Sequence, residues 1–476
     1  MTVSDLSDGV TEQPGLTPQA RKAVVVVLIG AILAFLDATV VNVALKSLST
    51  TLDSSLDTIQ WVVTVYMLAQ AAILPLSGWA VRRMGAKRLY VVSMLLFVVA
   101  SIGCGLAGNV GELIGARVFQ GIGGGLMVPA GQMILMTAAG PRGLARVMAA
   151  VGIPMVLTPV VGPTIGGLLL ENAGWQWIFL INAPLGLLGL VLAVRLLSAD
   201  KKTESAGPLD VFGLALASLA MTGLTYALTE VGSRGVSSLQ VLIPLSAGIV
   251  MIAAFVVRSL RVVNPVLDIR LYRNALFSSA SVATFVFGAA TFGAMVLLPL
   301  YFQLVRHQDA AHTGMLLAPQ GIGAAVAMAV SGRIFDRIGS RICVLGSVVS
   351  VVATLPFMLI TAGTSYWLLG AAMVVRGAGI GLAVMPAMTV ALQTLRPDQF
   401  SDATPQLNIM QRIGGSIGTA VFVAVLGNYL RDNGVQRGDQ ASAFGTTFAW
   451  VLAAAVVATV PTVAMAVLER RSKPTP

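Results

Sequence analysis

Long apolar segments recur along the whole chain, separated by short stretches rich in charged residues, glycine or proline. Each segment has about 20 residues, the length that an α-helix needs to cross about 30 Å of hydrocarbon. A membrane β-barrel would instead show alternating strands of about ten residues. The pattern therefore predicts an all-α polytopic membrane protein. Its fourteen predicted helices cover residues 23–45, 59–81, 89–108, 111–139, 147–170, 177–197, 209–229, 239–257, 275–303, 313–332, 341–362, 365–393, 404–429 and 443–467.

Composition and charge placement agree with this interpretation. The 476 residues are 56% hydrophobic and 11% charged, whereas soluble domains carry about 25% charged residues. An even number of helices puts both termini on one side, and that side carries 22 Lys and Arg residues against 5 on the other, with three inside helices. The positive-inside rule then predicts cytoplasmic termini. Because the net charge of +10 lies in these loops, without interleaved aromatic residues, no nucleic-acid partner is expected.

The two halves of the chain repeat each other. GWAVRRMGAKR at 78–88 follows the second predicted helix, and GRIFDRIGSR at 332–341 follows the tenth. Arg117, followed by a glycine-rich helix, corresponds in the same way to Arg376. The glycines are offset by 254 positions and the arginines by 259. Such internal duplication is typical of secondary transporters, whose substrate site lies between the repeats near the midplane of the membrane.

The repeats divide the chain into two six-helix bundles with two helices inserted between them. The predicted parts are a disordered cytoplasmic tail at 1–22, an N-terminal bundle at 23–197, the inserted helices with their loops at 198–274, a C-terminal bundle at 275–467 and a cytoplasmic tail at 468–476.

These motifs resemble the major facilitator superfamily, specifically its 14-helix drug:proton antiporter branch. The resemblance covers nearly the whole chain, and its stretches in order are LDATVVNVAL, GWAVRRMGAKR, RVFQGIGGG, GIPMVLTPVVGPTIGG, WQWIFLINAPLG, NPVLDIRLYRN and GRIFDRIGSR. Three positions depart from the family pattern. Arg82 stands where the loop motif usually has Asp, Lys46 where helix 1 usually has Pro, and Gln176 where Arg usually lies between two tryptophans.

The resemblance implies a proton-coupled antiporter in the bacterial plasma membrane that works as a monomer by alternating access. It would export amphipathic or lipophilic small molecules in contact with membrane lipid, with the proton gradient as its energy source and no cofactor. It also implies hinge, seal and gating roles for a set of residues in the fifth helix and in the two repeated loops. These residues are Gly152, Pro159, Gly162, Pro163, Gly166, Gly78, Arg83, Gly85, Gly332, Asp336, Arg337 and Gly339.

Asp37 is the acidic residue that lies well inside a predicted helix. A charged side chain at the bilayer centre costs about 2.5–3.5 kcal/mol on insertion scales and marks a functional site. By helix rise, Asp37 lies roughly 21 Å from the cytoplasmic edge and Arg117 roughly 9 Å from the outer edge of a core about 30 Å thick. The two share one depth, so we expect them to pair. An acid that can be neutralised, beside a guanidinium that cannot, is typical of a proton-coupling site.

Other interpretations of this pair stay open. Asp37 can simply anchor its helix through a hydrogen bond, and Arg117 can cap free carbonyl groups within the bundle. Gln120 and Gly121 follow Arg117 on the same helical face, where the amide can orient the pair and the glycine allows a neighbouring helix to approach closely.

Polar groups in apolar helices, together with methionine and aromatic side chains, are candidates for a broad-specificity substrate cavity. Taken singly, an apolar residue of this kind more often faces lipid or core. Arg376 and Arg412 are either structural or contacts for an anionic substrate. The candidate cavity residues are Asn42, Gln120, Met155, Tyr226, Phe292, Gln320, Asn408 and Arg412.

Two other classes of function remain as alternatives. The same fold can move an endogenous lipid or a metabolite made by the cell, or import its substrate by symport. A membrane enzyme is not expected, since the two histidines, His307 and His312, have neither a helix-face nor a common zinc spacing. The sequence predicts no catalytic and no metal site, and no nucleotide-binding GxxxxGK[ST] motif is present.

Overall fold

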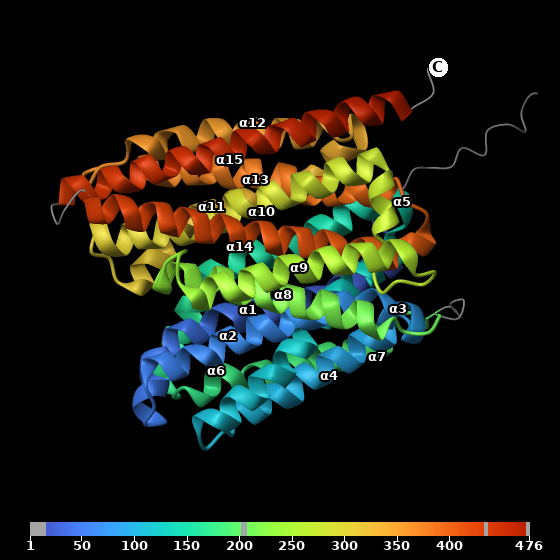
Figure 1. The fold of residues 1–476 in the computed structure, drawn as a ribbon, viewed down its shortest axis with the longest axis horizontal. Helices are drawn as coiled ribbons and strands as arrows, with labels where there is room; N and C mark the ends of the chain where they lie inside the picture. Colours follow the sequence, from blue (N-terminus) through green and yellow to red (C-terminus); the bar gives the residue numbers. More distant parts are fainter. Residues whose placement is uncertain (1–15, 201–206, 433–436, 473–476) are drawn as a thin grey trace, which may run out of the picture.

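A computed structural model describes residues 16–200, 207–432 and 437–472, except for some side chains within the helices. The described chain folds into helices joined by short turns (Figure 1). In order these are α1 (Pro18–Thr51), α2 (Leu56–Ile73), η1 (Leu74–Leu76), α3 (Ser77–Met84), α4 (Ala86–Gly105), α5 (Val110–Asn172), α6 (Gln176–Leu180), α7 (Asn182–Leu196), α8 (Val211–Arg234), α9 (Leu239–Arg261), η2 (Ile269–Arg273), α10 (Ala275–Leu300), η3 (Tyr301–Val305), α11 (Ala310–Ile338), α12 (Arg341–Thr354), η4 (Leu355–Leu359), α13 (Tyr366–Gln393), η5 (Pro397–Gln399), α14 (Phe400–Asp432) and α15 (Arg437–Ser472).

Thirteen helices of the described residues are long and apolar enough to span a membrane. The remaining predicted helix, 147–170, is the second part of α5, which continues to Asn172 through a kink at Gly140. Gly140 has a φ of 64°, a left-handed conformation that favours glycine, and the chain turns there from one span into the next. The all-α membrane fold expected from the apolar pattern is therefore confirmed.

The chain ends differ from the prediction. The side chain of Thr17 accepts a hydrogen bond from the amide of Ala20 and caps α1, so the last residues of the predicted disordered tail are helical. At the other end α15 continues to Ser472, beyond the predicted start of the C-terminal tail. Residues 1–15 and 473–476 lie outside the described part of the chain.

Helices α1–α7 pack against one another, and so do α10–α15 (Figure 1). Equivalent glycines bring neighbouring helices into contact in both halves. A Cβ at Gly123 of α5 would lie 2.8 Å from the backbone of α4 at Ser93 and Phe97, and one at Gly379 of α13 would lie 2.6 Å from the amide of Ser350 in α12. Small residues at such positions let membrane helices pack backbone to backbone.

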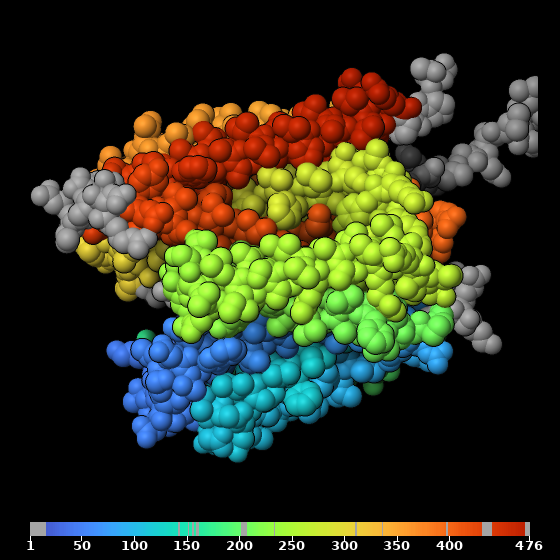
Figure 2. Space-filling model, in the orientation of Figure 1, coloured from blue at the N-terminus to red at the C-terminus, as the bar shows by residue number. Residues whose placement is uncertain are grey.

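The inserted helices α8 and α9 form a hairpin along the seam between α2 and α14. Figure 2 shows this hairpin as a green band across one face, between the blue N-terminal and the red C-terminal helices. Ser218 of α8 donates a hydrogen bond to the carbonyl of Ala72 in α2 at 2.6 Å. Farther along, Ala227 and Val231 pack with Ala420 of α14. The hairpin therefore bridges the two halves of the molecule.

The apolar core shows where the two halves meet. One cluster combines residues of both halves and includes Ala20 near the start of α1 and Met465 near the end of α15. On the opposite side two separate clusters form, one with Leu36 and Trp175 in the N-terminal half and one with Phe357 and Phe444 in the C-terminal half. The halves thus pack together on the side of the chain termini, and each has its own core on the far side.

Candidate functional site

Asp37 and Arg117 form a buried ion pair inside the N-terminal half. Asp37 lies in the middle of α1 and Arg117 in the first part of α5, and their residues are 1% and 0% exposed. Arg117 Nη1 donates to Asp37 Oδ2 at 2.5 Å, while its Nε donates to the carbonyl of Val62 in α2 at 2.9 Å. The guanidinium therefore holds together three helices around one carboxylate. The common depth inferred from helix rise agrees with this pairing.

Amide side chains from two further positions complete the environment of the acid. Gln120 Nε2 and Asn182 Nδ2 donate to Asp37 Oδ1 at 2.8 and 3.0 Å, and Gln120 Oε1 accepts from Arg117 Nη1 at 2.7 Å. Ser101 Oγ of α4 accepts from Gln120 at 2.5 Å. All of these side chains are buried. Buried polar groups need such partners, since an unpaired one loses its hydration without compensation.

The aromatic ring of Tyr66, on α2, packs against this network. The Cζ atom of Arg117 lies 4.0 Å from the ring centroid of Tyr66, close enough for a cation–π interaction. The hydroxyl of Tyr66 donates to the carbonyl of Ala34 at 3.2 Å. One helical turn later comes Gln70, and a Cβ at Gly124 would lie 3.2 Å from Tyr66 Oη and 3.1 Å from Gln70 Nε2. Tyr66 and Gln70 thus extend the ion-pair site along α2.

The arrangement suits reversible loss of a charge. As a carboxylate, Asp37 is matched by a guanidinium and two amide donors. When Asp37 takes up a proton, Arg117 becomes a buried cation without a counter-ion. Removing one partner of a buried pair costs about 3–5 kcal/mol, because the other charge remains unpaired. Protonation of Asp37 would therefore raise the free energy of this arrangement of helices, which favours a different packing.

Three residues of the site were not predicted. Asn182 lies in the WQWIFLINAPLG stretch and is a polar side chain in an apolar helix, so its polarity was a usable signal. Ser101 carries no such signal, because serine is common in membrane helices. Tyr66 could not be assigned to the site without the rotation of α2, because that rotation decides whether its ring faces Arg117.

The predicted cavity residues do not form one group. Gln120, expected on the cavity wall, is instead 0% exposed inside the ion-pair network. Gln320 is buried against Arg376, whose Nη1 donates to its Oε1 at 3.3 Å. Tyr226 stacks on Trp61, with ring centroids 6.0 Å apart, where α8 meets α2.

Two other cavity candidates join the halves, and the last three are placed differently. Asn408 Nδ2 donates to Gln132 Oε1 at 2.8 Å, and Arg412 Nη2 donates to Gln70 Oε1 at 2.5 Å. Phe292 of α10 is half-buried, and Asn42 is exposed and bonded to its own helix at the carbonyl of Ala38. The side chain of Met155 lies outside the described part of the chain.

The second part of α5 contacts different partners along its length. A Cβ at Gly152 would lie 2.6 Å from Met328 and 3.0 Å from Met385, both in the C-terminal half. Farther along, Gly162 faces Thr39 of α1, and Gly166 approaches Val40. Pro163 is half-buried, and the side chain of Pro159 is outside the described residues. The helix thus passes from the contact between the halves to a contact within its own half.

The repeated loops are fastened in the same way in both halves. Gly85 and Gly339 have φ angles of 88° and 60°. Asp200, after α7, accepts from the amides that follow Gly85, and Glu469 of α15 accepts from the amide of Ser340 at 2.7 Å. In each half the carboxylate therefore comes from the end of the bundle: Asp200 follows its last helix, and Glu469 lies within its last helix.

Other residues of these loops contact the opposite half. Gly78 faces the backbone carbonyl of Ser401, and Gly332 packs on the backbone of Arg146. Arg82, the departure from the family pattern, forms an ion pair with Asp402 of α14 at 2.5 Å.

Two charged residues of the loop motifs lie at the surface. Arg83 and Arg337 are exposed, and the side chain of Asp336 is not among the described ones.

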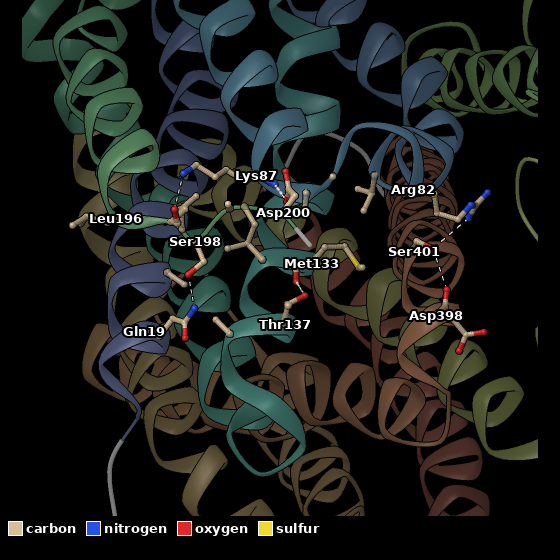
Figure 3. Close-up of a pocket in the computed structure, with 18 of the residues that line it drawn as sticks. Gln19, Arg82, Lys87, Met133, Thr137, Leu196, Ser198, Asp200, Asp398 and Ser401 are labelled. Carbon is tan, nitrogen blue, oxygen red and sulfur yellow. Dashed lines mark hydrogen bonds between the residues drawn. The ribbon is translucent and has the colours of Figure 1, made fainter. Parts of the chain in front are cut away.

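A cavity of about 600 Å³ lies at this side of the molecule. Figure 3 shows Lys87, Asp200 and Ser198 on one wall and Arg82, Ser401 and Asp398 on the other. Lys87 Nζ already donates to the carbonyls of Val194 and Leu197. The cavity lies at the helix ends and contains none of the cavity residues predicted from the sequence.

Comparison with known proteins agrees with the fold and with the motifs. The family model described as Major Facilitator Superfamily matches residues 27–419. The chain is 38% identical over 406 residues to the multidrug resistance protein B homolog of Mycobacterium tuberculosis, covering 84% of this chain and 75% of that one. It is 34% identical over 401 residues to the methylenomycin A resistance protein of Streptomyces coelicolor, covering 83% and 84%.

A solved structure supports the same fold. The human organic anion transporter MFSD10 matches with a TM-score of 0.63 and 15% identity, over 94% of this chain and 100% of that one. At this identity the likeness concerns the fold alone. Family model, relatives and fold together show that this membrane protein of the bacterial plasma membrane belongs to the major facilitator superfamily.

Proposed function

We propose that the protein is a proton-coupled antiporter that exports drug-like amphipathic molecules by alternating access. The drug-resistance relatives support export of this class of cargo. The observation that carries the coupling is the fully buried Asp37–Arg117 pair, since it places one titratable carboxyl beside a permanent cation inside the membrane.

The packing of the two halves suggests how the Asp37–Arg117 pair couples proton entry to movement of the halves. In the described conformation the halves contact each other on the terminal side, and Asp37 pairs with Arg117. A proton that enters from the far side would neutralise Asp37 and free Arg117. The lost pair then favours separation of the halves on the terminal side and release of the proton there. A membrane potential of 100 mV supplies about 2.3 kcal/mol per charge, and one pH unit supplies about 1.4 kcal/mol.

The remaining features of the proposal follow from the same scheme. The termini are cytoplasmic, so the far side is the outer one. The monomer suffices, and the proton gradient replaces any cofactor, catalytic group or metal. Export of an endogenous lipid would use the same machinery, and a substrate panel in everted vesicles with a pH-sensitive dye separates it from drug export.

The test is Asp37→Asn in everted vesicles, with Asp53→Asn as the matched control. Asparagine keeps the size of Asp37 and one acceptor oxygen, but it replaces the other oxygen by an NH2 group and cannot take up a proton. Asp53 undergoes the same chemical change in an exposed turn, and asparagine tolerates its φ of 45°. We expect ΔpH-driven efflux to disappear in Asp37→Asn and to stay normal in the control.

A retained melting temperature shows that the variant is folded. Efflux at the normal rate in folded Asp37→Asn would remove this carboxyl from the mechanism.

A further inference from the structure

The membrane-spanning helices hold an excess of positive charge. Asp37 neutralises Arg117. Arg376 and Arg412 are hydrogen-bonded to amide or backbone oxygens, and within the described part of the chain neither has a carboxylate partner. Charged groups at this depth are costly, so they pair with an opposite charge or face a substrate pathway.

The two arginines differ in access. Arg376 is 1% exposed and enclosed by α10, α11 and α13, where its Nη2 donates to the carbonyl of Ala290 at 3.1 Å. It ties helices of one half together. Arg412 is half-buried on α14, and its described partner, Gln70, belongs to the other half. Only Arg412 is therefore placed between the halves, where a substrate of this family is expected.

Arg412 belongs to a series of contacts between α14 and the N-terminal half. Starting from the terminal side, Asp402 pairs with Arg82, Asn408 with Gln132, and Arg412 with Gln70. Asn408 and Arg412 are four residues apart and so lie on the same face of α14.

An aromatic ring packs on α14 close to Arg412 in the sequence. Gly415 lies three residues after Arg412, on the same helical face, and a Cβ there would lie 2.8 Å from the ring of Phe292. The half-buried ring thus packs on α14 within one turn of the cation. On the other side of Arg412, Gln70 leads to Tyr66 and so to Arg117. A cation with an apolar wall fits a molecule with an anionic head and an aromatic or aliphatic body.

We propose that Arg412 binds the anionic group of the substrate, and that the preferred cargo is a carboxylate-bearing amphipathic molecule. This rests on the proposed export function and specifies its substrate class. The carboxylate replaces Gln70 as the partner of Arg412, so binding releases this link between α14 and α2. The apolar body lies against Phe292.

The charge balance of this exchange has a measurable consequence. One proton moves inward and one monoanion moves outward, so each cycle transfers two positive charges inward. Each charge moved through 100 mV is worth roughly a 50-fold gradient. At a given membrane potential, the largest concentration gradient of the carboxylate is therefore set by the square of that factor. For a neutral molecule, the largest gradient is set by the factor itself.

The experiment compares 4-biphenylcarboxylate with its carboxamide, which has the same shape without the charge. Binding of both to the purified full-length protein is measured by fluorescence, together with potential-driven uptake into everted vesicles, whose outer face is the cytoplasmic one. We expect the wild type to bind the carboxylate about tenfold more tightly or better. Arg412→Gln should reduce this preference to near one, while Arg412→Lys keeps most of it. Arg88→Gln, the same change at an exposed arginine, should leave it unchanged.

Equal binding of the two probes by the wild type overturns the inference, even if Arg412→Gln fails to fold. So does an equal loss of both probes in Arg412→Gln. If the wild type exports uncharged dyes but prefers no carboxylate, this inference fails and the export function stands. If no ΔpH-driven efflux of any dye is seen, the proposed function itself fails.

Discussion

The two halves of the molecule carry the same membrane arginine in different electrostatic surroundings. In the N-terminal half Arg117 donates to Asp37 of α1. In the C-terminal half, the described partners of Arg376 are the side-chain oxygen of Gln320 and the carbonyl of Ala290. The helix α10 opens its half as α1 does, yet it contains no acidic residue. The membrane arginine is thus present in both repeats, whereas its acidic partner is present only in the first.

This difference separates a structural role from a coupling role. Both arginines donate to a backbone carbonyl of a neighbouring helix, Arg117 to Val62 and Arg376 to Ala290. Tying helices together is therefore common to both halves. Among the described residues, only the first half pairs this arginine with a carboxyl group, so the proposed proton coupling rests on that half.

Replacing each arginine by glutamine gives the strongest test of this comparison. Arg117→Gln leaves the buried Asp37 without its counter-ion, a loss of about 3–5 kcal/mol. We expect ΔpH-driven efflux in everted vesicles to fall by about a hundredfold or more. Arg376→Gln should keep efflux within about threefold, since it removes no partner from an acid. Equal losses in the two variants would show that the halves do not differ in this way.

The repeated loops offer a second test, of intermediate size. The position held by Arg82 in the first loop corresponds to Asp336 in the second, and Arg82 pairs with Asp402 across the halves. Arg82→Asp puts two like charges together and should slow efflux about tenfold by weakening closure on the terminal side. Adding Asp402→Arg restores an opposite pair and should return most of the rate. A double variant that is no faster than Arg82→Asp would mean that this pair does not hold the halves together.

The smallest effect is expected from giving Arg376 a carboxylate. Gln320→Glu is nearly isosteric and places an acid on the oxygen that already accepts from Arg376. Hydrogen bonds to charged groups contribute about 1.5–3 kcal/mol, partly offset by desolvation, so Tm in detergent should rise by about a few degrees. In the Arg376→Gln background the same change should lower Tm, because the buried acid has no cation. If Gln320→Glu lowered Tm both in the wild type and in the Arg376→Gln background, a carboxylate at this position would not stabilise Arg376.

Much of the fold follows from the sequence because the bilayer acts on each segment separately. The apolar lengths located the helices, and a single acid inside an apolar helix identified Asp37. The common depth of Asp37 and Arg117 could be calculated from helix rise alone. Two antiparallel helices that enter from opposite sides have their depth fixed by the membrane edges.

The sequence was less informative about which side chains share a surface. Gln120 was expected on a cavity wall and is enclosed in the ion-pair network. Asn408 and Gln320 share the same chemistry, yet one joins the two halves and the other lies beside Arg376. Their positions depend on how far each helix is rotated about its axis. Helices that are apolar on all sides give little indication of that rotation.

The sequence alone determined the class of protein, the spans, the repeat and the presence of one titratable group in the membrane, because hydrophobic length and charge are properties of single segments. Only the tertiary structure decided that Asn182, distant in the chain, contacts Asp37, and that Arg412 meets Gln70 between the halves. Such contacts join helices from separate parts of the chain. They depend on rotation and tilt, which are fixed by packing against neighbouring helices.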